Sequence, residues 1–270
     1  MRIFTWNVNS IAVRQPLLER LLDAEQPDVI GLQELKTTDD RVPLEVFESR
    51  GYHVLSHGQR QYNGVLLASR TPLLATGTGL PEGDEDQARL CHATIATTAG
   101  GEGVHVVNLY CPQGSSADSD KFAYKLRFYD ALLAWLGTLP KARLIVLGDL
   151  NIAPEPRDIW DPVAMAGVPS FHPLEHERWR TLCGLGLSDA VAPRVAPGSY
   201  SFWDYRSLAF PRNEGMRIDH ILVGDAVRGA VRGAGILRSF RKKIDGMAAS
   251  DHAPVWIDLD PSALADEGKG

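Results

Sequence analysis

Several apolar segments of the chain border polar residues that could do metal and phosphate chemistry. Val29–Leu32 leads into Gln33-Glu34, Leu144–Leu147 leads into Gly148-Asp149-Leu150-Asn151, and Ser250-Asp251-His252 precedes a final apolar segment. Carboxylates, amides and an imidazole therefore gather where strands would stop. A sheet can hold groups from distant sequence positions in fixed register at such edges. The inventory suits a hard divalent cation and a phosphodiester.

Three of these residues could supply oxygen ligands to a metal ion. Glu34 follows one strand, Asn7 follows the first strand, and Asp251 lies near the C-terminus. Magnesium prefers such oxygen donors and keeps several water ligands. Each residue taken singly is more often a turn cap or a solvent-facing group, so the prediction of a Mg²⁺ site depends on their joint occurrence.

Asp149 and Asn151 flank one residue directly after an apolar strand. A carboxylate at that place can orient or deprotonate a water molecule. The Asn151 amide could hold that carboxylate or a phosphate oxygen. The alternative is an ordinary Asx turn, which would carry no chemistry.

His252 follows Asp251 and offers a cation or a hydrogen-bond donor to a nonbridging phosphate oxygen. Asp219 is a candidate to fix the tautomer of His252. A buried histidine considered alone would more often be structural, so this assignment also depends on the other residues of the set.

The elements that must position these residues alternate between strands and helices. Apolar spacing indicates a helix that includes Pro16–Leu22 and ends before Pro27, another over about 121–139, and a third near 175–185. The segments expected to be strands are 2–6, 29–32, 64–69, 91–97, 104–109, 144–147, 218–223 and 255–259.

This order predicts two sheets that pack together and carry helices on their outer faces. Short turns, such as the one at 99–103, favour antiparallel neighbours. Residues 153–201 are expected to form a long surface connection. We expect a single catalytic domain over residues 1–260 and a frayed polar tail over 261–270.

Length and composition bound the function classes. The chain has 270 residues, 44% of them hydrophobic, and no linker-like stretch divides it. No apolar run is long enough to span a membrane, and no signal peptide is evident, so a soluble cytoplasmic monomer is expected. Three cysteines without metal-type spacing indicate reduced thiols. The net charge of -6 weakens a nucleic-acid function without excluding it, because Arg238, Arg241, Lys242 and Lys243 cluster locally.

Seven motifs occur in the order seen in exonuclease III-type DNA-repair nucleases, and the chain closely resembles that family from Met1 to about Leu259. The motifs are Trp6-Asn7-Val8-Asn9, Leu32-Gln33-Glu34-Leu35-Lys36, Asn108-Leu109-Tyr110-Cys111-Pro112-Gln113-Gly114, Gly148-Asp149-Leu150-Asn151-Ile152, Phe202-Trp203-Asp204-Tyr205-Arg206, Arg217-Ile218-Asp219 and Ser250-Asp251-His252-Ala253-Pro254.

The resemblance implies a deoxyribonuclease I-like fold, which is a four-layer α/β sandwich of two mixed, largely antiparallel sheets flanked by helices. It also implies a Mg²⁺-dependent enzyme of base excision repair, for which Mn²⁺ can substitute. Such an enzyme acts on duplex DNA as an apurinic/apyrimidinic endonuclease and a 3′–5′ exonuclease, and associates with the nucleoid when acting. The reaction it implies is in-line attack of water on phosphorus.

The resemblance also assigns roles. Glu34 would be the main metal ligand, with Asn7 and Asp251 near the metal. Asp149 would orient or activate the attacking water. The remaining roles fall to Asn151, which would position the water and the phosphate; Tyr110, which would contact the phosphate; His252 with Asp219, which would stabilise phosphoryl charge; and Asn9 and Lys121, which lie at family positions near the phosphate.

Four further residues are candidates for contact with the substrate. Phe202 and Trp203 are either core residues or a wedge that packs against an unstacked sugar. The resemblance implies that aromatic residues at this motif line the pocket for a baseless sugar, which makes Phe202 the better candidate for contact. By resemblance, Met216 lies near the same pocket. His172 occupies a position where relatives often carry another residue, and its bulk could shift preference from abasic sites toward 3′ ends.

The sequence supports other functions less well than that of a DNA-repair nuclease. His172-Pro173-Leu174-Glu175-His176 fits an inverted zinc-protease motif, but Pro173 is tolerated only in a helix's first turn, which places His172 at the cap. A sphingomyelinase or an inositol phosphatase of the same fold could share the catalytic residues, and a noncatalytic DNA-binding protein would have lost some of them. Phosphate-loop and serine-hydrolase motifs are absent.

Overall fold

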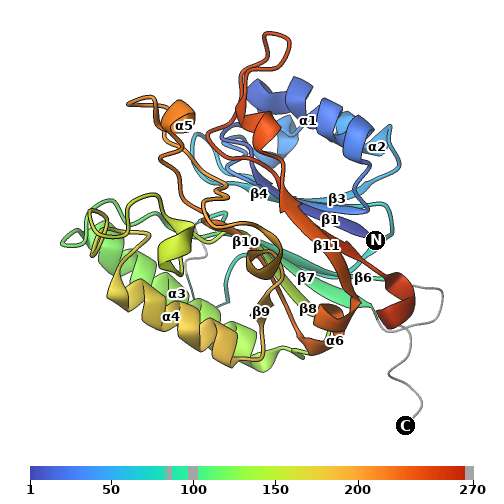
Figure 1. Ribbon diagram of the computed structural model, residues 1–270. Coiled ribbons are helices and arrows are strands. Elements are labelled where there is room, and N and C mark those ends of the chain that lie inside the picture. The colour runs from blue at the N-terminus through green and yellow to red at the C-terminus, as the bar shows by residue number, and fades with distance from the viewer. Residues whose placement is uncertain (82, 84–86, 97–102, 265–270) are drawn as a thin grey trace.

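The computed structural model describes residues 1–81, 83, 87–96 and 103–264 and shows two six-stranded sheets packed face to face (Figure 1). The first sheet has the order β11-β12-β1-β2-β4-β3. Its β1–β2 pair is parallel and its other pairs are antiparallel. Its strands are β1 (Arg2–Asn7), β2 (Val29–Gln33), β3 (His53–His57), β4 (Val65–Ser69), β11 (Val231–Ile236) and β12 (Val255–Leu259).

The second sheet has the order β5-β6-β7-β8-β10-β9, and within it only β7 and β8 pair in parallel. Its strands are β5 (Leu73–Thr78), β6 (Leu90–Ile95), β7 (Val104–Tyr110), β8 (Leu144–Asp149), β9 (Ser188–Asp189) and β10 (Asp219–Val223).

Helices cover the outer face of each sheet, and this completes four layers (Figure 1). Near the first sheet lie α1 (Ile11–Glu25) and α2 (Leu44–Glu48), and near the second lie α3 (Asp120–Thr138) and α4 (Pro173–Gly184). The remaining helices are short: α5 (Ala209–Arg212), α6 (Asp225–Ala230) and the 3₁₀ turns 39–41, 156–158, 192–194, 238–241 and 261–264.

Three apolar clusters explain the layering. One lies between the sheets and includes Ile3, Leu67, Val106 and Leu147. The other two lie between the sheets and their helices. Strands buried on both faces read as continuous apolar runs, which is why β4 and β8 were evident in the sequence. The predicted fold class is confirmed.

Details of the predicted elements differ from the structure. The first helix begins at Ile11, five residues before Pro16, and continues through that proline. The tail predicted to be frayed begins with a 3₁₀ turn whose Leu264 is 1% exposed and packs in the core between the sheets. Residues 97–102 and 265–270, which include most of the predicted 99–103 turn, lie outside the described residues. No helix among the described residues is long and apolar enough to cross a membrane.

Candidate active site

The two sheets deliver the predicted residues to one shared edge. Asp149 ends β8, and its register places it opposite both Tyr110 of β7 and Asp219 of β10. From the first sheet, Asn7 ends β1 and Glu34 follows β2. Asp251 and His252 complete the site from the segment before β12.

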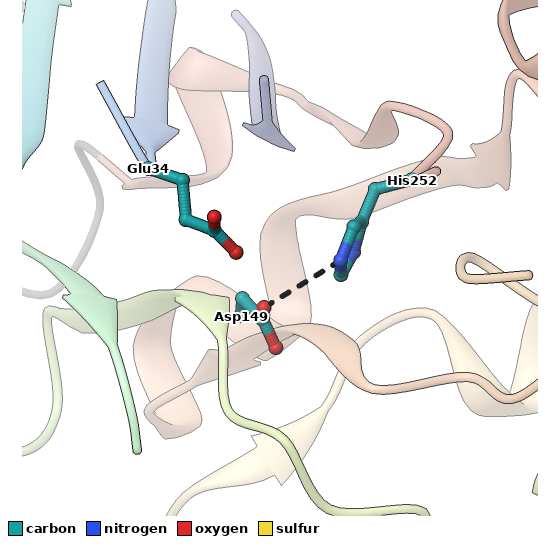
Figure 2. Close-up of side chains that lie close together, drawn as sticks. All are labelled: Glu34, Asp149 and His252. Atoms are coloured by element: carbon teal, nitrogen blue, oxygen red, sulfur yellow. Dashed lines mark ion pairs between the residues drawn. The ribbon is translucent and has the colours of Figure 1, made fainter. Parts of the chain in front are cut away.

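Glu34, Asp149 and His252 point toward a common centre (Figure 2), and one polar atom from each lies within 4.8 Å of the others. The Asn7 amide nitrogen donates to Glu34 Oε1 at 2.8 Å and to Asp149 Oδ2 at 2.9 Å. Asn7 is buried, so it holds two carboxylates from different sheets at a fixed separation. The side-chain nitrogen of Asn7 therefore faces the two carboxylates. Its side-chain oxygen, the atom that could bind a metal ion, does not make these contacts.

His252 lies between two buried carboxylates. Its Nδ1 is 2.8 Å from Asp219 Oδ2, and its Nε2 is 3.8 Å from Asp149 Oδ2. Burial disfavours the charged imidazole, but the carboxylates of Asp219 and Asp149 outweigh burial and raise the pKa of His252 to about 10. The ring is therefore an imidazolium near neutral pH. In this form it supplies a positive charge and hydrogen-bond donors, and it is a poor metal ligand.

Asp149 is 1% exposed and is held by two hydrogen bonds, from the Asn7 amide and from the Asn151 backbone at 3.0 Å. Burial raises the pKa of Asp149 to about 7, against the opposing effect of the His252 cation. A carboxyl group with a pKa near neutrality suits a general base, because proton transfer is then nearly balanced.

The Glu34 carboxylate forms an ion pair with Lys36. Lys36 Nζ is 2.7 Å from Glu34 Oε2 and also donates to Asn9, whose amide nitrogen donates to Asp251 Oδ1 at 2.9 Å. Burial opposes ionisation of Glu34, but Lys36 and Asn7 outweigh it and keep the pKa of Glu34 below its usual value. Glu34, Lys36, Asn9 and Asn151 all have positive φ angles of 45–56°, and such left-handed conformations gather at functional sites.

Tyr110 and Asn151 face the same cleft. Burial, reinforced by the charges of Glu34 and Asp149, raises the pKa of Tyr110 well above its usual value, so its hydroxyl remains a donor. The Asn151 amide nitrogen donates to the Cys111 carbonyl at 2.9 Å, which fixes the side chain beside Asp149.

The structure separates the predicted substrate-contact residues. Phe202 and Met216 line the cleft, and the Phe202 ring lies 4.9 Å from the His252 ring. Trp203 is 0% exposed and donates to Asn213, so its predicted contact with a sugar is wrong and the core alternative is correct. Lys121 is not among the cleft residues and lines an adjoining pocket beside Tyr110.

His172 caps α4 and is not among the cleft residues. Its Nδ1 accepts from Leu174 N at 3.1 Å, and its ring packs against Phe122. The other histidine of the zinc-protease motif, His176, contacts the Ala153 carbonyl, so the two do not form the metal-binding pair of that motif. An effect of His172 on substrate preference stays a prediction.

Two groups near the site were missed in the sequence. Lys36 lies two residues after Glu34 in the motif Leu32-Gln33-Glu34-Leu35-Lys36, and that spacing could have identified it. Lys125 and Glu175 form an ion pair with fully buried side chains, and Lys125 also donates to the carbonyl of Asn151 at 2.7 Å. Nothing in local sequence spacing joins two residues that lie on different helices.

The donor set fits a hard divalent cation. The Glu34 carboxylate is paired with the Lys36 ammonium group, so this position already holds a cation. Asp149 and Asp251 add oxygen atoms to the same cleft. Cysteine thiols do not line the cleft. Cys91 and Cys111 are buried in the core, where burial raises the pKa of each to about 12, and Cys183 lies in α4. Oxygen-rich sites of this kind suit Mg²⁺ or Mn²⁺ better than softer metals.

Comparison with known proteins agrees with this geometry. The profile of the Endonuclease/Exonuclease/phosphatase family matches residues 4–252. The chain belongs to this family. Its predicted resemblance to exonuclease III-type nucleases is confirmed by 35% identity to exodeoxyribonuclease III of Haemophilus influenzae, over 96% of this chain and 100% of that protein.

Two solved structures of the family share the whole fold. A 3′ phosphatase from Neisseria, bound to a product DNA hairpin, matches with a TM-score of 0.89 and 36% identity over 96% of this chain and 99% of that chain. An AP endonuclease from Archaeoglobus fulgidus matches with a TM-score of 0.88 and 30% identity over 96% and 99% of the two chains. The family's metal-dependent phosphodiester chemistry is consistent with the acidic cluster at the sheet edge.

Proposed function

We propose that this protein is a Mg²⁺-dependent DNA-repair phosphodiesterase that incises duplex DNA at abasic sites and removes nucleotides from 3′ ends. The observation that carries the proposal is the Glu34, Asp149 and His252 cluster, held within 4.8 Å at the edge shared by both sheets. The named relatives of similar length, an exodeoxyribonuclease III and an AP endonuclease, support DNA as the substrate. We place the enzyme in the cytoplasm, as a monomer that acts at the nucleoid.

The chemistry proposed is in-line attack of water on phosphorus, with the 3′ oxygen as leaving group. Asp149 takes the proton of the water, and its bonds to Asn7 and to the Asn151 backbone fix the direction of attack. Asn151 positions the water and the phosphate, and Tyr110 donates to a phosphate oxygen. The His252 imidazolium, held by Asp219, neutralises charge that develops on the phosphoryl group.

Glu34 is the proposed principal ligand of Mg²⁺, with Asn7 and Asp251 beside it and Lys36 as the cation that the metal would displace from Glu34. A bound Mg²⁺ would supply positive charge to the phosphate and the leaving oxygen, which is worth several kcal/mol of stabilisation. Asn9 would order Asp251 and Lys36 around that position.

Phe202 and Met216 are the proposed walls for the sugar. Both are apolar, both line the cleft, and they pair with each other through an isolated bridge. A sugar that lacks its base can turn toward such a wall at low cost, because it has no stacking to lose.

A second candidate is a 3′-end specialist with little abasic-site activity. The 36% identity to the Neisseria 3′ phosphatase favours it, because that enzyme is named for chemistry at DNA 3′ ends.

The test uses two labelled duplexes, one with an internal abasic-site analogue and one with a recessed 3′ end, each incubated with Mg²⁺ or with EDTA. The proposal predicts Mg²⁺-dependent cleavage of both. Trimming of the 3′ end alone would identify the specialist, and cleavage of neither would contradict DNA as the substrate.

A further inference from the structure

A second cavity opens directly off the proposed sugar site. It has a volume of about 430 Å³ and shares six lining residues with the catalytic cleft. Phe202 and Met216 are among the shared residues, so they face both spaces. A ligand held at the sugar walls can therefore extend into the second cavity without leaving the protein surface.

One wall of this cavity is apolar and aromatic, and it is formed by Trp160, Met165, Val168 and Pro169. Ser115, Ser207 and Glu214 add polar groups to the lining outside the part shared with the cleft. Trp160 is 43% exposed and Val168 is 39% exposed, so both side chains are accessible to a ligand in the cavity. Aromatic and thioether groups of this kind suit a flat, uncharged ligand.

The charged residues at the rim are already paired. Arg206 forms an ion pair with Asp204 at 2.9 Å, and Glu214 accepts from Arg212 at 2.6 Å. An anionic ligand would have to compete with these carboxylates for its cation. A neutral ring would not, and its polar edge could meet them at the rim.

The backbone fixes this cavity relative to the catalytic histidine. Isolated bridges connect Ile159 to Met216, Met216 to Phe202, and Phe202 to His252. Trp160 continues this ladder, because its backbone nitrogen donates to the Gly215 carbonyl at 3.1 Å. Four short segments therefore hold Trp160 in register with the reaction centre.

The loop that carries the apolar residues is also ordered by hydrogen bonds. The Asp161 side chain accepts from the backbone of Val163 and Ala164. Glu175, paired with Lys125 in the interior, accepts from the backbone of Ser170 at 3.1 Å. The cavity wall is thus formed before any ligand arrives, which lowers the entropy lost on binding.

We propose that this cavity is a subsite for the nucleobase of the 3′-terminal nucleotide, which stacks on Trp160 while its sugar lies against Phe202 and Met216. The inference rests on the proposed nuclease function and names the part of the substrate that distinguishes its two activities. A 3′-terminal nucleotide has a base to place there, whereas an abasic site has none. Trp160 is therefore a specificity residue for 3′ trimming.

The kinetic test compares a substrate that carries this base with a substrate that lacks it. One is a duplex with a recessed natural 3′ nucleotide, and the other carries an internal abasic-site analogue. Because stacking of one base on an aromatic side chain contributes about tenfold or more to binding, Trp160→Ala should lower kcat/KM for the 3′ end by about tenfold and leave abasic-site incision within about twofold. Trp160→Phe should restore most of the loss.

Val163→Ala is the matched control. Val163 lies on the same loop and is 86% exposed, but it does not line the cavity, so both activities should be unchanged. Equal losses on both substrates with Trp160→Ala, or no loss on the 3′ end, would overturn the subsite.

A binding measurement separates failure of the subsite from failure of the proposed function. A duplex with 2-aminopurine as its 3′-terminal base is titrated with protein in EDTA, where no cleavage is expected. Stacking predicts quenching of its fluorescence by the wild type and little quenching by Trp160→Ala. Equal fluorescence in both complexes contradicts the subsite even if both are active nucleases, whereas quenching by a protein without nuclease activity supports the subsite alone.

Discussion

At the scale of single residues, the catalytic proposal depends on a row of three buried side chains, Asp219, His252 and Asp149. The first carboxylate orients the imidazole and the second is directed at the proposed water. Because His252 carries a positive charge only while carboxylates surround it, removing Asp219 should affect the reaction more than the fold.

Asp219→Asn should lower kcat by about 10²-fold or more with little change in KM, since the charge on His252 matters most in the transition state. Initial rates on the abasic-site duplex measure this, and circular dichroism checks the fold. Asp225→Asn, at an exposed position of α6, serves as control and should retain full activity. A loss confined to KM would mean that Asp219 acts in binding.

Glu34→Gln keeps the shape of the side chain and removes the charge that the metal requires. We expect Mn²⁺ affinity, measured by electron paramagnetic resonance, to fall by at least about tenfold, because hard cations bind carboxylates far better than amides. Glu45→Gln, exposed on α2, should bind Mn²⁺ as the wild type does. Unchanged affinity in Glu34→Gln would remove Glu34 from the metal site.

Sequence reasoning brought together residues that the structure places in one cleft where they lie next to strand ends. Asp149 and His252 became candidates because each is next to an apolar strand. The burial of Trp203 was not decided, because an aromatic residue after a turn has the same pattern in a core and in a pocket. The ion pair of Glu34 with Lys36 was overlooked although the two are adjacent in one motif.

At the scale of elements, β8 delivers Asp149 through an unusual backbone. Gly148 has φ of +140°, and a Cβ atom there would lie 2.0 Å from the Leu109 carbonyl oxygen of the neighbouring strand β7. Only glycine fits both the dihedral angle and the close approach of the two strands.

Gly148→Ala should therefore destabilise the protein by at least about 2 kcal/mol, because the new methyl group meets backbone that cannot move aside. Gly137→Ala is the matched control. Gly137 lies in α3 with open space around its Cβ position, and the change should stabilise by about 0.5–1 kcal/mol. Thermal unfolding of both variants measures these changes: the melting temperature should fall for Gly148→Ala and rise for Gly137→Ala. Equal melting temperatures would contradict the proposed role of Gly148 in β8.

Element boundaries were harder to predict than element types. The α1 helix passes through Pro16, a residue normally expected to begin or end a helix. Its buried face, from Ile11 to Leu22, outweighs one missing hydrogen bond. Tertiary packing decided this boundary, and packing cannot be read from local spacing.

At the scale of the whole molecule, the site exists only when the two sheets are packed together. Glu34 comes from one sheet and Asp149 from the other. A buried polar contact also joins the sheets: Asn108 of β7 donates to the carbonyl oxygens of Leu32 and Leu66, in β2 and β4, at 3.0 and 2.9 Å. The sequence predicted both sheets but gave no means of pairing these partners.

Asn108→Ala should lower the free energy of unfolding by about 2–4 kcal/mol, because it leaves buried carbonyl groups without a donor and opens a small cavity. It should also lower the activity of the folded fraction. Val106→Ala, in the same strand and core, removes packing without a hydrogen bond and should retain more activity at equal stability. Urea denaturation followed by circular dichroism and by activity measures both effects. An unchanged unfolding midpoint would show that Asn108 does not join the sheets.

The central claim is that a metal-dependent reaction occurs at the edge shared by the two sheets, with Asp149 as the group that activates water. Single-turnover incision of an abasic-site duplex in Mg²⁺ by Asp149→Asn tests it most directly. The account predicts a correctly folded protein whose rate is at least about 10²-fold below that of the wild type. A rate above about a tenth of the wild-type value would contradict the role given to Asp149 and with it the proposed mechanism.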